Sequence, residues 1–242
     1  MKLTYSILLL MLWIPLYGQT NQGKTNKLNI DQYDYSKIWT HTDNQVIFGF
    51  IGNNHQRIRV KFITVSRDPN DMGLYNITGK TMVKGNICDF TGTITIAAFS
   101  KYSKASYGVD NEYKNKVKAQ YGLTGLYTFY EDKTQKHVGV FKGSVKTNFY
   151  VDRKDQVHYD DIDLNADGFT NNEFVGIWTS YDGKITKICN WGDYRIPNAG
   201  SFDHGAGEFG PNTKDVSLGW QSYIDQFKSA EAKKEEQRTW WK

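Results

Sequence analysis

The chain has 242 residues, of which 15% are aromatic and 23% are charged, and its formal net charge is +4. Because lysines and arginines are dispersed rather than clustered, this mild positive charge indicates no nucleic-acid partner. The length suits one large β domain or two small ones. A chain that is polar on average yet rich in aromatic residues is typical of strands with one buried and one solvated face.

The first eighteen residues have the pattern of a secretory signal peptide. Lys2 precedes an apolar run from Tyr5 to Tyr17, and a polar stretch begins at Gln19. The run is shorter than the ~20 apolar residues that a membrane-spanning helix needs, and no cysteine follows it directly for lipid attachment. We expect residues 1–18 to be removed and the rest to be exported to the periplasm, cell surface or medium, without a transmembrane span. An uncleaved anchor is the alternative.

Residues 19–36 are polar and are predicted to form a tether. A β domain is then expected over residues 37–211, because apolar and polar residues alternate in segments that end in local turns. About nine or ten strands are predicted, and no helical pattern long enough for a crossover separates them. The clearest segments are residues 45–51, 57–65, 75–83, 86–99, 125–130, 138–151, 173–179 and 184–189.

Three of these segments repeat an aromatic–x–glycine–x–apolar pattern, at Phe90–Ile94, Phe141–Val145 and Phe174–Trp178. The three key residues of each pattern lie on one face of a strand. Glycine inside a strand indicates that the sheet bends or that another group approaches its backbone closely. We therefore predict an all-β fold, either a strongly curved antiparallel sheet or an up-and-down barrel.

Two regions depart from the strand pattern. Residues 100–122 mix lysines and tyrosines without periodicity, as a long surface or functional loop does. In residues 212–242, Val216, Trp220 and Phe227 stand at helical spacing, and a charged stretch follows them. We expect an amphipathic C-terminal helix that packs on the sheet or plugs one barrel end, followed by a charged tail.

An acidic segment resembles half of a calcium-binding loop. Counting from Asp163, oxygen ligands stand at the first, third and fifth positions, and a glycine stands at the sixth. Position twelve, which should carry a bidentate carboxylate, is Phe174, and Glu173 lies one residue early. Calcium is therefore a possible cofactor, and a plain acidic hairpin is the alternative. The candidate metal ligands are Asp163, Asn165, Asp167 and Glu173.

The stretch from Asn190 to Pro197 is dense in residues that loops use for recognition. Trp191 and Tyr194 offer flat faces, and Asp193 and Arg195 offer directed hydrogen bonds, a mixture that binds sugars and protein partners. We predict that these four residues bind a ligand at a barrel mouth formed by residues 100–122 and 190–210. The alternative is that an Asp193–Arg195 pair fixes a loop over the barrel mouth and that Trp191 is buried.

The two cysteines, Cys88 and Cys189, form one possible disulfide in an oxidising compartment, and two buried free thiols are the alternative. Asp203, His204 and Glu208 are the only close group of acids and bases, and no nucleophile motif or paired metal spacing accompanies them. We therefore assign no catalytic residues.

The motifs Asn86–Gly92 and Cys189–Pro197 resemble an uncharacterised family of exported bacterial all-β proteins over most of the chain. A looser similarity is to the calycins, whose first strand carries Gly-x-Trp. Gly176–Trp178 matches that triplet but stands late in the chain. The resemblance implies export and a β fold, and no activity.

Together these patterns predict a binding protein that holds a small molecule or glycan at the mouth of the barrel. A structural or interaction component of the cell envelope, with a protein partner, is the alternative, and a secreted hydrolase is a third.

Overall fold

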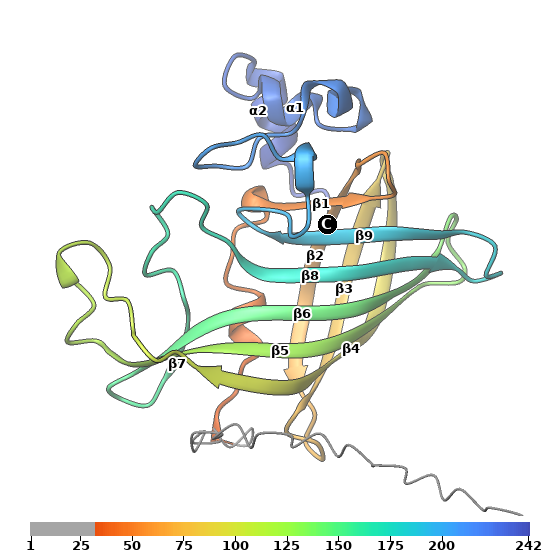
Figure 1. Ribbon diagram of the computed structural model, residues 1–242. Coiled ribbons are helices and arrows are strands. Elements are labelled where there is room, and N and C mark those ends of the chain that lie inside the picture. Colours follow the sequence, from red (N-terminus) through yellow and green to blue (C-terminus); the bar gives the residue numbers. More distant parts are fainter. Residues whose placement is uncertain (1–31) are drawn as a thin grey trace, which may run out of the picture.

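A computed structural model describes residues 32–242, so the predicted signal peptide and most of the predicted tether lie outside the described residues. The chain forms an all-β fold with a short helical region at its C-terminus (Figure 1). The strands are β1 (Ile47–Ile51), β2 (Gln56–Arg67), β3 (Leu74–Val83), β4 (Asn86–Lys101), β5 (Val117–Glu131), β6 (Gly139–Asp152), β7 (Val157–Tyr159), β8 (Asn171–Ser180) and β9 (Thr186–Asp193).

Eight of the nine strands close into an antiparallel up-and-down barrel, which confirms the predicted fold class. Each strand from β1 to β5 pairs with the next along the chain, β6 pairs with β8, β8 pairs with β9, and β9 returns to pair with β1. The short strand β7 lies outside the ring and pairs with β6 alone. In Figure 1 the strands β5, β6, β8 and β9 run across the front, roughly crosswise to β2, β3 and β4 behind them.

The glycines of the repeated pattern face the barrel interior, where they allow close approach. Gly143 and Gly176 pair with each other across β6 and β8. A Cβ atom at either position would overlap a carbonyl oxygen of the neighbouring strand and the hydroxyl group of Tyr127. The side chain of Tyr127 on β5 can therefore lie over the inner face of β6 and β8 only because both positions lack a side chain.

One end of the barrel is filled by the segment that precedes β1. Tyr35, Ile38 and Trp39 are buried in the main core. The Trp39 indole donates a hydrogen bond to Thr147 Oγ1 at 3.0 Å, and the Tyr35 backbone N–H donates to the Tyr75 hydroxyl at 3.0 Å. The core therefore begins within the region that the sequence pattern assigns to a polar tether.

The C-terminal segment covers the outside of the barrel over β1 and β2 (Figure 1). It contains a 3-10 helix (Thr213–Leu218) and the helices α1 (Gln221–Asp225) and α2 (Ala230–Gln237), in place of one long helix. Phe48, Phe50 and Trp220 form a second apolar core beneath it. Trp220 is fully buried, whereas Phe227, from the same predicted stripe, is 81% exposed.

A buried ion cluster fixes α2 to the outer face of β2. Arg57 donates to both carboxylate oxygens of Glu236, at 2.7 and 2.6 Å, and Arg59 donates to Glu236 Oε1 at 2.8 Å. Burial alone would raise the pKa of Glu236, but the two arginines outweigh it and hold that pKa below its ordinary value.

Candidate functional site

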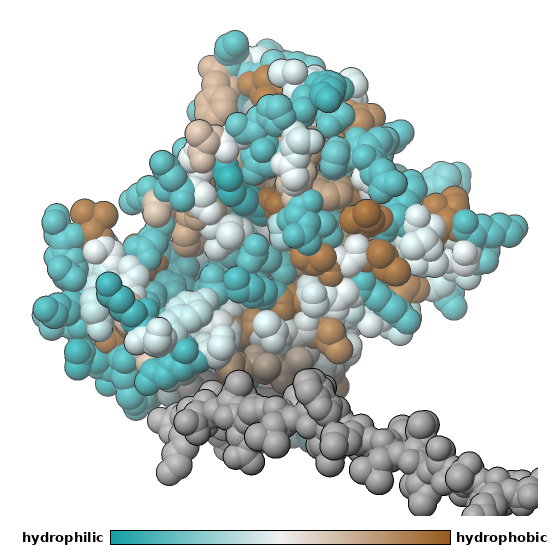
Figure 2. Space-filling model, viewed as in Figure 1, coloured by the Kyte–Doolittle hydropathy of each residue, from teal (hydrophilic) through white to brown (hydrophobic). Residues whose placement is uncertain are grey.

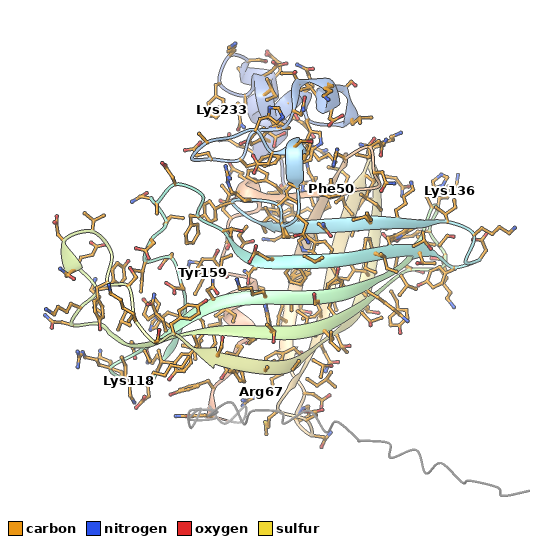
Figure 3. All side chains as sticks on the ribbon, viewed as in Figure 1. Phe50, Arg67, Lys118, Lys136, Tyr159 and Lys233 are labelled. Carbon is orange, nitrogen blue, oxygen red and sulfur yellow. The ribbon has the colours of Figure 1, made fainter. Side chains whose placement is uncertain are left out.

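The barrel end opposite the N-terminal segment is an open cup of about 910 Å³. It lies among the turns that join β1 to β2, β3 to β4, β5 to β6 and β8 to β9. This end is on the right in Figure 3, where Lys136 is labelled. The cup falls within the volume range of small-molecule sites in proteins.

The walls of the cup are the last inward-facing residues of the strands. Phe141 on β6 pairs with Trp178 on β8, and Trp178 pairs with Lys187 on β9, so these three side chains share the inner face. Ile51 and Val83 add aliphatic surface from β1 and β3. The cup therefore combines an aromatic and aliphatic wall with charged groups at its rim.

Glu131, at the end of β5, is the buried carboxylate of the cup. It is 5% exposed and accepts three hydrogen bonds: from Thr81 Oγ1 at 2.6 Å, from Trp178 Nε1 at 2.8 Å and from the Gly139 backbone N–H at 2.9 Å. Burial raises the pKa of Glu131, and these donors oppose the rise. Glu131 thus ties β3, β6 and β8 together and fixes the orientation of the Trp178 ring.

Both cysteines are free and buried, so the predicted disulfide is not formed. Cys88 lies on β4 and Cys189 on β9, and β1, β2 and β3 separate these strands in the barrel wall. Cys88 lines the cup, and burial raises the pKa of its thiol to about 11. A thiol with so high a pKa is a weak nucleophile at neutral pH.

The four residues predicted to bind a ligand do not form one exposed surface. Trp191 and Asp193 belong to β9 and are each 3% exposed, and the Trp191 ring stacks on Phe174 at 4.7 Å between centroids. Arg195 donates to the backbone carbonyls of Gly205 and Glu208 and so holds the loop that follows β9. The half-buried Tyr194 packs edge-on against Phe169. The buried Trp191 matches the alternative, but Arg195 forms its ion pair with Asp203, at 3.6 Å, and not with Asp193. The ligand role of the four residues stays a prediction.

Asp193 is the centre of a polar network at the closed end of the barrel. Its Oδ2 atom accepts hydrogen bonds from Thr42 Oγ1 at 2.6 Å, Asn172 Nδ2 at 2.7 Å and the Tyr159 hydroxyl at 2.9 Å. Burial raises the pKa of Asp193 to about 7 despite these donors. The network joins the N-terminal segment to β7, β8 and β9, so it holds the barrel closed at this end.

The predicted calcium ligands are spread over a loop and a strand. Asp163 Oδ1 accepts a hydrogen bond from Ser106, Asn165 and Asp167 lie in exposed turns, and Glu173 forms an ion pair with Lys146 on β6 at 3.6 Å. Within residues 32–242, no group of three or more His, Cys, Asp or Glu side chains is placed to hold a metal ion. Calcium binding stays a prediction.

The close acid–base group also has structural contacts. Asp203 Oδ1 accepts from the backbone N–H groups of Gly205 and Gly210, and His204 bonds to Asn212 at 3.0 Å. Glu208 is exposed.

The barrel mouth that the sequence predicts, formed by residues 100–122 and 190–210, is at the wrong end. Those segments lie where the N-terminal segment already fills the barrel, and the open cup lies at the other end.

The sequence pattern does not identify Glu131 and Lys187 as residues of the cup, because each stands beside a turn and is interpreted as solvent-exposed. Alternation with Phe129 and Cys189 respectively is the signal that places both on the inner face.

Comparison of the chain with protein-family models, with curated proteins and with solved structures finds no match. The resemblance to exported all-β proteins therefore stays a prediction, and function must be argued from the geometry. No helix within residues 32–242 is long and apolar enough to cross a membrane.

Proposed function

We propose that this chain is a binding protein that holds a small molecule in the cup. The observation that carries the proposal is the difference between the two barrel ends. At one end a chain segment with three buried core residues fills the interior, whereas the other end retains a cavity walled by Phe141 and Trp178. Concave sites with apolar walls and a few fixed polar groups are where proteins bind small molecules.

The walls favour a ligand with an apolar part over a glycan with polar groups throughout. Val83, Val138 and the edge of Trp178 present carbon surface, with Ile51 and Phe141 almost fully buried beside them. The buried carboxylate of Glu131 already accepts three hydrogen bonds. Export is part of the proposal and is supported by the pattern of residues 2–18. Mass analysis of exported protein should find Gln19 at or near the N-terminus, and retention of Met1 would contradict export.

The test uses the uncharged fluorophore N-phenyl-1-naphthylamine, whose emission rises in apolar sites. Wild-type protein should enhance its fluorescence in a saturable manner. Val83→Trp should abolish the enhancement by filling the cup, whereas Ile177→Trp, on the outer face of β8, should retain it. Circular dichroism checks that both variants are folded. No enhancement by the wild type, or equal enhancement by both variants, would refute the proposal.

A second candidate function is an interaction with a protein of the cell envelope. Figure 2 shows apolar side chains on the face formed by the front strands. Ile177 and Ile188 pair across β8 and β9 with their side chains 44% and 47% exposed, and Leu126 on β5 is 62% exposed. Exposed apolar surface of this kind marks interaction sites when it is contiguous. Cross-linking in intact cells should capture a partner with wild-type protein and lose it with Ile188→Lys, and equal capture would exclude this face.

A further inference from the structure

The rim of the cup is positively charged. Four lysines line it, one from the β3–β4 turn, two from the β5–β6 turn and one from β9, and all four are exposed: Lys84, Lys133, Lys136 and Lys187. None of them forms an ion pair with a carboxylate of residues 32–242, although other lysines of the barrel do. Asp182, the acidic residue of the rim, forms an ion pair with Lys184, with 3.8 Å between Oδ2 and Nζ.

Lys84 occupies a backbone conformation that lysine rarely adopts. Lys84 and Gly85 form the two-residue turn between β3 and β4, with φ angles of 51° and 80°. Both central positions of such a turn have positive φ, which favours asparagine, aspartate or glycine. A lysine here has a backbone cost that asparagine would largely avoid, and strained residues of this kind occur at functional sites.

Besides the rim lysines, the cup has one charged group deeper inside, and this group is not available to a ligand. The Glu131 carboxylate is occupied by Thr81, Trp178 and the Gly139 backbone. The remaining inner surface includes the half-buried Val83 and Val138, whereas Phe141 and Ile51 are almost fully buried. A bound molecule would therefore meet apolar side chains inside and ammonium groups at the mouth, an arrangement that attracts anions and orients them outward.

We propose that the ligand of the cup is an amphiphile with an anionic head group, a carboxylate, sulfate or phosphate, held among the rim lysines. Its apolar body lies against Trp178 and Val83. This inference rests on the proposed function, since it names the chemistry of the molecule that the cup would hold.

The test compares three ligands with the same tail, dodecanoate, dodecanol and dodecylamine, as competitors that displace the uncharged fluorophore. Dodecanoate should displace it at about tenfold lower concentration than dodecanol, as expected for several exposed ion pairs acting together. Dodecylamine should be no better than dodecanol. The advantage of dodecanoate should shrink at about 0.5 M salt, because surface charges are then screened.

Paired variants locate the effect. Replacing the four rim lysines by glutamine should remove the advantage of dodecanoate and leave dodecanol unchanged. A control variant of the same net charge carries glutamine at four exposed lysines away from the cup and should behave as wild type. These lysines are Lys37, Lys104, Lys114 and Lys154. Brominated dodecanoate should quench tryptophan fluorescence in wild-type protein and quench it less in Trp178→Phe.

The outcomes separate the two proposals. If the three ligands compete equally, or if the control loses the advantage as well, the anionic class is refuted and the cup stands as a site for apolar molecules. If the fluorophore itself does not bind, both proposals fail. Co-sedimentation with phosphatidylglycerol vesicles that is lost in the four-lysine variant would assign the head group to a membrane lipid. Displacement by dodecanoate without co-sedimentation would assign it to a free amphiphile.

Discussion

Replacing Asp193 by asparagine should make the protein more stable at alkaline pH. The folded carboxyl has a pKa raised to about 7 by burial, against an ordinary value of 3.8. Between these two pH values the folded state holds a proton that the unfolded chain has released, so the contribution of Asp193 to stability is largest below pH 4 and is lost as the pH rises to about 7. The difference corresponds to about 4 kcal/mol of unfolding free energy at ~1.36 kcal/mol per pH unit.

Asp193→Asn imitates the protonated side chain. Its carbonyl oxygen can accept the three hydrogen bonds that Oδ2 accepts from Thr42, Tyr159 and Asn172. Urea denaturation at pH 5 and pH 8 measures the effect: the variant should lose less stability than the wild type across this interval. Asp110→Asn, an exposed loop substitution, is the control and should follow the wild type. Parallel stability curves for wild type and Asp193→Asn would refute the assignment of a protonated carboxyl.

Four further outcomes are expected. Trp191→Ala should cost about 3–5 kcal/mol in urea denaturation as a buried aromatic deletion, and a cost below about 1 kcal/mol would contradict its core position. Glu236→Gln should lower the free energy of unfolding by about 3 kcal/mol, because it leaves Arg57 and Arg59 buried without a full counter-charge. It should also make the C-terminal segment sensitive to protease. The control Glu231→Gln, at an exposed position, should have neither effect. Lys84→Asn should raise the melting temperature yet weaken dodecanoate binding, whereas a gain in both would show that the lysine serves no ligand. If the loop at Asp163 binds calcium, millimolar calcium should raise the melting temperature relative to chelator, and superimposable melting curves would leave the acidic loop without a metal role.

The strands of the curved antiparallel sheet could be predicted from the sequence because their main determinant is local, whereas the closure of the sheet into a barrel could not. Phe90, Gly92 and Ile94 lie two residues apart, and this spacing alone places them on one face of a strand. The same alternation fails around Gln120, which is buried although polar, because it donates to Asp160 from another part of the chain. The structure accordingly starts β5 at Val117, inside the stretch expected to be a loop.

The site could not be predicted in the same way, because it depends on which barrel end is filled. Tyr35 and Trp39 stand among polar residues, and their burial follows from contacts with Tyr75 and Thr147, far away in sequence. A tryptophan such as Trp191 is as typical of a binding loop as of a buried core, so its residue type does not show where it lies. Only the pairing of β9 with β1 and β8 shows that its ring points inward.

The pairing of β1 with β9 determines when this protein can fold. Ile47 is matched with Asp193, so the ring cannot close until almost the whole barrel sequence has been synthesised. Until then β1 and β8 are unpaired edges on which other chains can add strands. A product truncated before Thr186 would keep both edges permanently, because it would lack the strand that joins them.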